Sequence, residues 1–319
     1  MTIEYLEPLS RAYQRMKAAL FKPFDLGKWF AVGFTAFLAG LLDGPGGGGG
    51  GSRGRDYGWG RVGDDLGDFL ESPGSFFGKV WEWLLSHHIW LFIILFAVVF
   101  AIVLVIVFTW LSSRGRFMFL DNVVHDRAEV VKPWKEFRDP AYSLFLWRLA
   151  YGFICFLVIV GFIAVTIVGA SSIYKTNNYI PVLFFVFMGL FFILLVLVMA
   201  YISLFLSNFV VPIMYKEKLT AVQAWSRFLS LFGKHPFHFI FYGLFVFFLI
   251  LFVMIGYILA GVMTCCVGLL LLVLPYIGTV VTLPLWYTFR AFSLEYLAQF
   301  GPELQLFPPT QPEPENAAA

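Results

Sequence analysis

The stretch Asn208–Leu244, NFVVPIMYKEKLTAVQAWSRFLSLFGKHPFHFIFYGL, carries the pattern from which the rest of the fold follows. An apolar run ends near Pro212, a basic amphipathic segment follows, and a second apolar run begins at Phe237. Thr220 and Gln223 have the spacing of a capping box, which predicts that a helix begins there. Helical spacing predicts an apolar face made of Val222, Trp225, Leu229 and Phe232. The stretch therefore predicts two membrane spans joined by a surface helix.

The composition of the 319-residue chain is that of a membrane protein. Hydrophobic residues make up 60% of the chain and charged residues 13%, whereas about a quarter of the residues in soluble domains are charged. The net charge of +2 gives no reason to expect a nucleic-acid partner. We predict an all-α, polytopic integral membrane protein whose main partner is the lipid bilayer.

Six apolar runs predict transmembrane helices, because crossing the hydrocarbon core takes about 20 residues. They cover approximately residues 26–42, 89–111, 149–170, 181–211, 237–263 and 267–288. The first run is short, so a re-entrant or interfacial helix is the alternative there. We expect Pro212 to end the fourth span, and Pro275 and Pro284 to kink the sixth. The six spans would form a single transmembrane domain, residues 1–290.

The segments outside the spans have their own signatures. Residues 43–63 are rich in glycine and predict an extracytoplasmic linker, since they lack the Gly-Lys-Ser/Thr ending of a phosphate-binding loop. The apolar face of residues 76–84 predicts an interfacial helix. Residues 291–319 would form a cytoplasmic tail, disordered from about residue 307, where the chain becomes acidic and rich in proline.

The basic residues predict how the chain is oriented in the membrane. With six spans and both termini in the cytoplasm, 17 of the 22 lysines and arginines fall on the cytoplasmic side. Such a bias is what the positive-inside rule expects. If the first run did not cross, the bias would nearly vanish. The charge count therefore favours six spans and a multi-pass protein of a bacterial inner membrane.

Two of the basic stretches align without gaps at an offset of 91 residues. The matched pairs are Val131 with Val222, Trp134 with Trp225, Phe137 with Phe228, Tyr151 with Tyr242, and Gly152 with Gly243. We interpret them as copies in a threefold repeat, each a cytoplasmic amphipathic helix followed by a two-span hairpin, with the N-terminal stretch as a looser copy. Such repeats would be parallel in the membrane. Chance similarity between aromatic-rich segments is the alternative.

The interiors of the predicted spans contain no Asp, Glu, Lys or Arg. Proton-driven antiporters, ion pumps and intramembrane metalloproteases need such groups, so these classes are disfavoured. The most polar intramembrane cluster is Ser203, Ser207 and Asn208, which we interpret as packing contacts between helices, with a ligand site as the alternative. No catalytic motif, cofactor site or metal site is predicted, and no enzymatic activity.

The basic amphipathic segments favour contact with anionic phospholipids on the cytoplasmic face. Each Lys or Arg near such a surface contributes about 1 kcal/mol of attraction, and aromatic rings suit the headgroup level. The predicted lipid-interface residues are Arg11, Arg15, Lys17, Trp134, Trp225 and Arg227.

Two segments carry a resemblance to known proteins, VPIMYKEKLTAVQAWSRFLSLFGKHP (211–236) and VLPYIGTVVTLPLWYTFRAFSLEYL (273–297). In these the chain resembles a group of bacterial multi-span proteins that are similar to the membrane region of some glycerophosphodiester phosphodiesterases. The resemblance covers about the last two thirds of the chain and implies no catalytic residue, because the soluble phosphodiesterase domain is absent from this sequence.

The sequence thus leads to a functional hypothesis without a defined substrate. We expect a non-enzymatic membrane protein that organises the membrane, interacts with lipid or assists a partner. The alternative is a permease for a neutral or lipid-like substrate, with a path near Asn208. An enzyme acting at the membrane interface is a third, weaker alternative.

Overall fold

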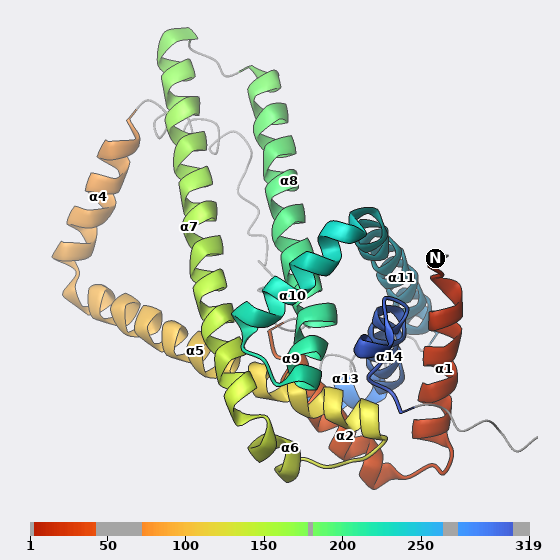
Figure 1. Ribbon diagram of the computed structural model, residues 1–319. Coiled ribbons are helices and arrows are strands. Elements are labelled where there is room, and N and C mark those ends of the chain that lie inside the picture. Colours follow the sequence, from red (N-terminus) through yellow and green to blue (C-terminus); the bar gives the residue numbers. More distant parts are fainter. Residues whose placement is uncertain (1–2, 43–71, 178–180, 264–273, 309–319) are drawn as a thin grey trace, which may run out of the picture. The chain divides into compact units, whose positions relative to one another are not determined.

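The computed structural model describes residues 3–42, 72–177, 181–263 and 274–308, and these contain helices and no strand (Figure 1). The Gly-rich segment 43–63 lies outside the described residues. By its internal contacts the chain divides into two units. The first comprises residues 1–48, 109–147 and 203–319, and the second residues 49–108 and 148–202. We describe each unit by itself.

Four helices are long and apolar enough to cross a membrane. They are α5 (His88–His125), α7 (Arg138–Asn177), the continuous helix α8 (Val182–Phe205), η1 (Leu206–Val210) and α9 (Val211–Glu217), and α11 (Pro236–Met263). At 1.5 Å per residue, even a helix of 28 residues such as α11 is about 42 Å long, more than the hydrocarbon core. The protein is therefore helical and has the character of a membrane protein.

The second unit contains α4 (Pro73–Ser86), α5 up to residue 108, α7 from residue 148 onward and α8 up to residue 202. Helix α4 includes residues 76–84, for which an interfacial helix was predicted. Helices α7 and α8 contact each other through the rings of Phe162 and Phe192, whose centroids are 5.2 Å apart. The hydroxyl of Tyr151 on α7 also donates a hydrogen bond to the carbonyl of Met199 on α8. Most apolar side chains of this unit are exposed, as expected where lipid replaces water as solvent.

The first unit contains most of the buried side chains. It holds parts of α5, α7 and α8 and the whole of η1, α9 and α11, together with α1 (Leu6–Phe21), α2 (Leu26–Gly40), α6 (Val131–Glu136), α10 (Ala221–Lys234), α13 (Pro275–Val281), α14 (Leu283–Ala298) and the short η2 (Pro302–Leu304). Helix α1 packs along α14, and α2 packs on α13 (Figure 1). Aromatic rings fill the interior: the Phe209 and Phe239 centroids are 5.0 Å apart, and those of Tyr242 and Tyr296 are 4.6 Å apart.

Helix α5 extends well beyond the predicted span, which was expected to end at residue 111. Ser112–His125 was predicted to begin a polar cytoplasmic stretch, but it is helical, and every residue from Gly115 to Val124 is buried. Small residues explain the difference. The Ser112 hydroxyl donates to the carbonyl of Ala39 at 2.9 Å, and a Cβ on Gly115 would lie 2.5 Å from the Ala39 nitrogen. Ser112 and Gly115 thus allow α5 to pack closely against α2.

One of the three prolines acts differently from the prediction. The helix does not end at Pro212, because the chain continues as α9 to Glu217. Pro275 is the first residue of α13, and Pro284 is the second residue of α14. Pro275 and Pro284 occupy the first turn of a helix, where the missing N–H costs no hydrogen bond, whereas Pro212 lies inside the continuous helix formed by α8, η1 and α9. The helix is interrupted at Thr282, two residues before Pro284, and residues 264–273, before Pro275, lie outside the described residues, so the kinks of the sixth span stay a prediction.

The surface helix of the opening stretch begins where it was predicted, but a different face is buried. Thr220 is the N-cap of α10 and forms the capping box with Gln223. The buried positions of α10 are Ala221, Ala224 and Phe228. Val222 and Leu229, predicted for the apolar face, are exposed. Alanines permit close helix packing, so the face rich in small residues is the one that is buried.

That the first and the last predicted spans cross the membrane stays a prediction. Helix α2 has 15 residues, a length of about 22 Å, which is short for a bilayer core. Residues 264–273 of the sixth predicted span lie outside the described residues, and α13 has seven residues. The predicted tail is also different, because residues 291–297 are buried within α14 and Phe307 is buried as well.

Candidate functional site

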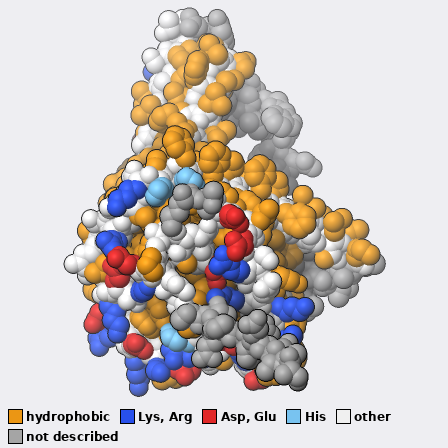
Figure 2. Space-filling view, turned by 45° about the vertical axis from the view of Figure 1, so that its right-hand side comes forward, with side chains coloured by type: hydrophobic (Ala, Val, Ile, Leu, Met, Phe, Trp, Pro, Cys, Tyr) orange, Lys and Arg blue, Asp and Glu red, His pale blue; other side chains and the backbone are white. Residues whose placement is uncertain are grey.

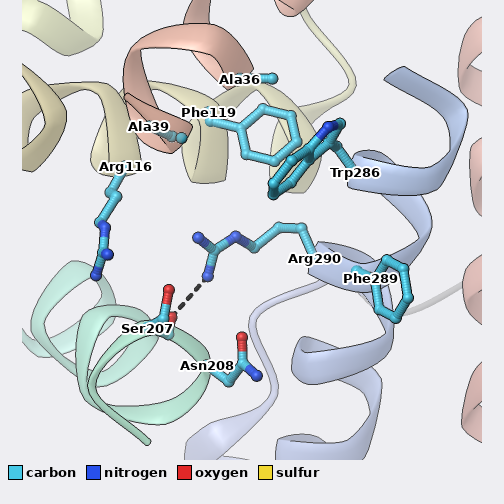
Figure 3. A pocket seen from close by; sticks show the side chains of 10 residues that line it. Ala36, Ala39, Arg116, Phe119, Ser207, Asn208, Trp286, Phe289 and Arg290 are labelled. Atoms are coloured by element: carbon cyan, nitrogen blue, oxygen red, sulfur yellow. Dashed lines mark hydrogen bonds between the residues drawn. The ribbon is translucent and has the colours of Figure 1, made fainter. Parts of the chain in front are cut away.

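A cavity of about 110 Å³ in the first unit brings two arginines together. We call it the arginine pocket. Its polar and aromatic lining comes from Arg116 on α5, Ser207 and Asn208 on η1, and Trp286, Phe289 and Arg290 on α14. The four other lining residues are apolar or small and come from α2 and α5. Figure 3 shows the Arg116 and Arg290 side chains directed toward Ser207 from two helices.

The position of Arg290 follows from the geometry of the π-helical turn η1. The Val211 N–H donates to the carbonyl of Leu206, one residue further back than in an α-helix. Pro212 has no N–H, so it cannot donate to the carbonyl of Ser207. Arg290 Nη1 donates to that carbonyl instead, at 2.7 Å. The π turn and the proline together create an acceptor that holds the Arg290 side chain at the pocket.

The lining gives the arginine pocket a positive character. Arg116 is 3% exposed and Arg290 is 8% exposed. Among the described residues that line the arginine pocket, none is acidic. Burying a guanidinium group carries a large desolvation cost unless charge or hydrogen bonds offset it. The hydroxyl of Ser207 and the amide of Asn208 add polar atoms to the same wall. The arrangement can therefore bind an anionic group.

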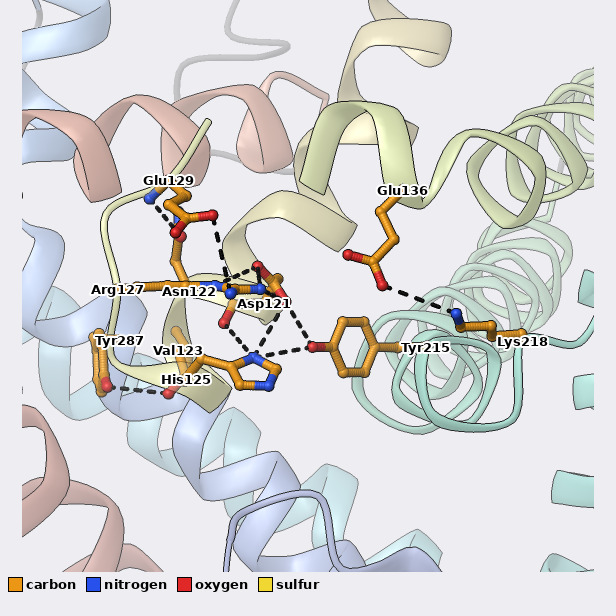
Figure 4. Close-up of polar contacts among 10 residues, drawn as sticks. All are labelled: Asp121, Asn122, Val123, His125, Arg127, Glu129, Glu136, Tyr215, Lys218 and Tyr287. Atoms are coloured by element: carbon orange, nitrogen blue, oxygen red, sulfur yellow. Dashed lines mark hydrogen bonds and ion pairs between the residues drawn. The ribbon is translucent and has the colours of Figure 1, made fainter. Parts of the chain in front are cut away.

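A second polar cluster is centred on Asp121 near the end of α5 (Figure 4). Arg127 binds this carboxylate with two nitrogens, Nη2 at 2.7 Å and Nε at 3.0 Å from Oδ2. The Tyr215 hydroxyl donates to Oδ1 at 2.7 Å. Burial lowers the pKa of Arg127, but the hydrogen bond and charge of Asp121 outweigh this effect and raise it. Asp121 is 1% exposed, so the cluster is a buried ion pair that fixes the chain after α5.

The carboxylate of Glu295 on α14 forms a similar pair with α1. Arg15 Nε lies 2.5 Å from Glu295 Oε1, and Arg11 Nη1 lies 3.8 Å from Oε2. The Phe307 ring lies over the Arg15 guanidinium at 4.0 Å. Next to Glu295, burial raises the pKa of the Tyr296 hydroxyl, and its hydrogen bond with Tyr5 adds to the effect. Arg11 and Arg15, predicted to contact lipid, therefore have a protein partner.

A third site, which we call the basic surface pocket, combines three cations with an indole. It is lined by Arg114 on α5, Trp134 and Lys135 on α6, and Arg138 on α7. The Arg114 guanidinium lies 4.7 Å from the Trp134 ring centroid and donates to the Trp134 carbonyl at 3.1 Å. A cation held over an indole in this way is positioned at little entropic cost. None of the four lining residues is acidic.

The predicted lipid-interface residues are thus placed in different surroundings. Trp134 lines the basic surface pocket. Trp225 stacks on Trp147 with centroids 5.3 Å apart, and Arg227 binds Glu303 at 2.8 Å. Lys17 is exposed. Figure 2 shows basic and acidic side chains close together over part of the surface and hydrophobic side chains over other parts.

The predicted intramembrane polar residues are only partly brought together. Ser207 and Asn208 are half-buried and line the arginine pocket, as the alternative interpretation as a ligand site requires. Ser203 lies one helical turn earlier, on α8, and is exposed. Of the predicted cluster, only Ser207 and Asn208 line the arginine pocket, together with Arg116 from α5 and Arg290 from α14.

Sequence reasoning missed the four buried charged residues. Arg116 and Arg290 were only counted among the 17 basic residues expected on the cytoplasmic side. A signal was present in the sequence: Arg116 is followed by Leu120 and Asp121, and Arg290 is followed at the same spacing by Leu294 and Glu295. In both segments the first arginine lines the arginine pocket. The carboxylate five residues later, Asp121 or Glu295, binds an arginine outside that pocket.

Two of the five matched pairs of the proposed repeat share their burial, whereas Tyr151 and Gly152 are less buried than their matches Tyr242 and Gly243. Val131 and Val222 are both exposed, at 68% and 70%. Phe137 and Phe228 are both buried, and each stacks on a phenylalanine of the preceding helix at angles of 10° and 9°. These similarities agree with a repeat of two surface helices. The threefold repeat itself stays a prediction.

Comparisons with known proteins place the chain in a family. A family model matches residues 4–307, nearly the whole chain. The chain belongs to DUF7544, a family of unknown function. No curated protein and no solved structure matches it. Within the described residues, no group of three or more His, Cys, Asp or Glu side chains could hold a metal ion.

Proposed function

We propose that the protein is a non-enzymatic membrane protein that binds anionic phospholipid at the cytoplasmic face of a bacterial inner membrane. The observation that carries the proposal is the basic surface pocket. Arg114, Trp134, Lys135 and Arg138 line this pocket, and none of these described lining residues carries a carboxylate. Resemblance to the membrane region of glycerophosphodiester phosphodiesterases is in keeping with a role that involves lipid.

The chemistry of the pocket suits a phosphate headgroup. A guanidinium group can donate two parallel hydrogen bonds to phosphate oxygens, and the ammonium of Lys135 adds a mobile charge. An indole beside these cations favours the level of the lipid headgroups. Each cation near an anionic membrane surface contributes about 1 kcal/mol. Three cations in one pocket are therefore sufficient for selective binding of anionic over zwitterionic lipid.

The distribution of basic residues supports the proposed orientation. With both termini in the cytoplasm, 17 of 22 basic residues, including the three of the basic surface pocket, would face the anionic leaflet. This orientation requires an even number of spans, and six is our proposal, with residues 26–42 as the first crossing and residues 267–288 as the last. The threefold repeat of surface helix and hairpin belongs to the same proposal.

A binding experiment tests this function. The purified full-length chain in neutral detergent is titrated with fluorescent phosphatidylglycerol and, separately, phosphatidylcholine. The double variant Arg114→Gln/Lys135→Gln removes two charges, so affinity for phosphatidylglycerol should fall roughly 30-fold, at about 1 kcal/mol for each charge. Affinity for phosphatidylcholine should stay the same.

The matched control removes two exposed charges that do not line the pocket. Lys132 lies on the same helix as Lys135, and Lys234 lies at the end of α10; both are exposed. The variant Lys132→Gln/Lys234→Gln should bind phosphatidylglycerol within about threefold of the wild type. Equal losses in the two double variants would show that only overall charge matters, and the proposed pocket would be rejected.

The alternative, a permease for a neutral or lipid-like substrate, has less support. Its path was expected near Asn208, but that region contains two buried arginines. A neutral passenger would have to displace the groups that stabilise these charges without replacing them. An anionic group is favoured at this position over a neutral one.

A further inference from the structure

We infer that the basic surface pocket binds a phospholipid headgroup that carries two phosphates, of the cardiolipin type, in preference to a headgroup that carries one. This inference rests on the proposed function and names the class of lipid. It is carried by the geometry of the pocket, in which cations from three helices line a single volume of about 420 Å³. Arg114 comes from α5, whereas Lys135 and Arg138 come from the junction of α6 and α7.

The junction of α6 and α7 is held against α5 by Phe137. This residue lies between Lys135 and Arg138 in the sequence and is 5% exposed. Its ring stacks on Phe117 of α5, with centroids 6.0 Å apart and planes at 10°. Phe117 lies three residues after Arg114, a spacing that places both on one face of the helix. The stacked rings therefore set Lys135 and Arg138 beside the face of α5 that carries Arg114.

The Arg114 guanidinium is ordered before a lipid arrives. It lies 5.0 Å from the ring centroid of Trp110 and 4.7 Å from that of Trp134, two indoles whose planes meet at 85°. Its hydrogen bond to the Trp134 carbonyl uses one of the five N–H donors of a guanidinium group. Other donors can bind the oxygens of a phosphate, and little side-chain entropy is lost when they do. Arg114 is therefore suited to hold a first phosphate.

Lys135 and Arg138 supply the charge for a second phosphate. Both are exposed, and in the part of the chain that the structure describes neither forms an ion pair with a carboxylate. The neighbouring Glu136 pairs with Lys218 instead, at 3.8 Å, and Asp139 does not line the pocket. The charges of Lys135 and Arg138 are thus available to a ligand.

Charge and size favour two phosphates over one. Three like charges in one pocket repel each other, and a phosphodiester with its single negative charge offsets only part of that repulsion. A headgroup with two phosphodiesters brings two charges, and once the first is bound the second is held at a high local concentration. A volume of about 420 Å³ is also within the range of pockets that hold a whole small molecule.

Lipids that differ in the number of phosphates test the inference. The purified full-length chain in neutral detergent is titrated with fluorescent cardiolipin and with fluorescent phosphatidylglycerol at equal phosphate concentration. Cardiolipin should bind roughly tenfold more tightly, because its second phosphate meets further cations at high local concentration. Phosphatidic acid, which carries close to two charges on one phosphate, should bind more weakly than cardiolipin. Equal affinities for these two lipids would show that charge alone decides, and would overturn the inference.

The decisive variant is Lys135→Gln/Arg138→Gln, which keeps Arg114 and removes the cations assigned to the second phosphate. The preference for cardiolipin over phosphatidylglycerol should fall from roughly tenfold to about twofold. The control Lys132→Gln/Lys234→Gln removes two charges outside the pocket and should keep the full preference. All four side chains are exposed, so both variants should have the unfolding midpoint of the wild type.

The outcomes separate this inference from the proposed function. Phosphatidylglycerol binding that the variants of the pocket leave unchanged would overturn both. Phosphatidylglycerol binding that depends on the pocket, together with equal affinity for cardiolipin, would overturn only the preference for two phosphates. A preference for cardiolipin that survives in Lys135→Gln/Arg138→Gln would place the second phosphate elsewhere, and it would also overturn the inference.

Discussion

In soluble proteins apolar residues are usually buried and charged residues exposed, but the two halves of helix α5 show the opposite arrangement. Between His88 and Phe108, where nearly every residue is apolar, no side chain is buried. Between Gly115 and Val124, where Arg116 and Asp121 occur, every residue is buried. One continuous helix therefore exposes its hydrophobic part and covers its charged part. The comparison teaches that, along α5, the buried segment is the one that contains charged residues, whereas the uninterrupted apolar segment is exposed as lipid-facing helices are.

The reversal has a physical basis in the solvent of each half. Lipid tails are as apolar as leucine, so exposed leucines and phenylalanines of the first half cost nothing in a bilayer. In the second half, charged groups are stable only where the protein supplies partners. Asp121 has Arg127 and Tyr215, and Arg290 of the neighbouring α14 has the Ser207 carbonyl.

The largest effect that tests the comparison is expected for Asp121→Asn. Removing the charge leaves Arg127 without its carboxylate, and breaking a buried ion pair costs about 3 to 5 kcal/mol. The measurement is equilibrium unfolding in mixed micelles, followed by tryptophan fluorescence. We expect the unfolding midpoint to fall strongly.

Asp126→Asn is the control, since it lies five residues away and its side chain is 56% exposed in a pair with Lys28. Asn also tolerates the left-handed backbone of residue 126, where φ is 50°. Asp126→Asn should lower the free energy of unfolding by less than about 1 kcal/mol. If both variants were equally mild, burial of the charged half would not contribute to stability as we argue.

A second effect compares two leucines of α5 directly. Leu120 is fully buried, whereas Leu95 is 56% exposed. Leu120→Ala should lower the free energy of unfolding by about 3 kcal/mol, because it leaves a cavity among packed side chains. Leu95→Ala should change it by less than about 1 kcal/mol, since lipid or detergent fills the space. The same unfolding assay measures both, and a larger loss at Leu95 would contradict the comparison.

Much of the architecture could be predicted from local patterns. The helix start at Thr220 follows from the capping box, and α11 begins and ends within one residue of the prediction, because a long apolar run is a strong signal. The positions at which helices end were harder to predict. Ser112 and Gly115 look like the start of a polar loop, yet their small side chains are what permits contact with α2.

The candidate site could be predicted only in part, because it joins residues far apart in the sequence. Ser207 and Asn208 stood out as polar residues in an apolar run. Arg116 and Arg290 did not, because a positive charge at the edge of an apolar run is most often solvated. Their role depends on the π turn, and nothing in local periodicity predicts that Pro212 would leave a carbonyl for a side chain from α14.

The smallest of the three effects compares glycines in the two kinds of surroundings. A Cβ on Gly115 would lie 2.5 Å from backbone atoms of α2, whereas nothing lies within 4 Å of a Cβ on Gly152 of α7. Gly115→Ala should therefore force α5 and α2 apart and cost about 1 to 3 kcal/mol. Gly152→Ala should be neutral or stabilising by up to about 1 kcal/mol, because alanine favours the helix. A loss of unfolding free energy for Gly115→Ala together with no loss or a gain for Gly152→Ala would show that α5 and α2 are in close contact. A change of the same sign in both variants would contradict that contact and the wall of the arginine pocket that it forms.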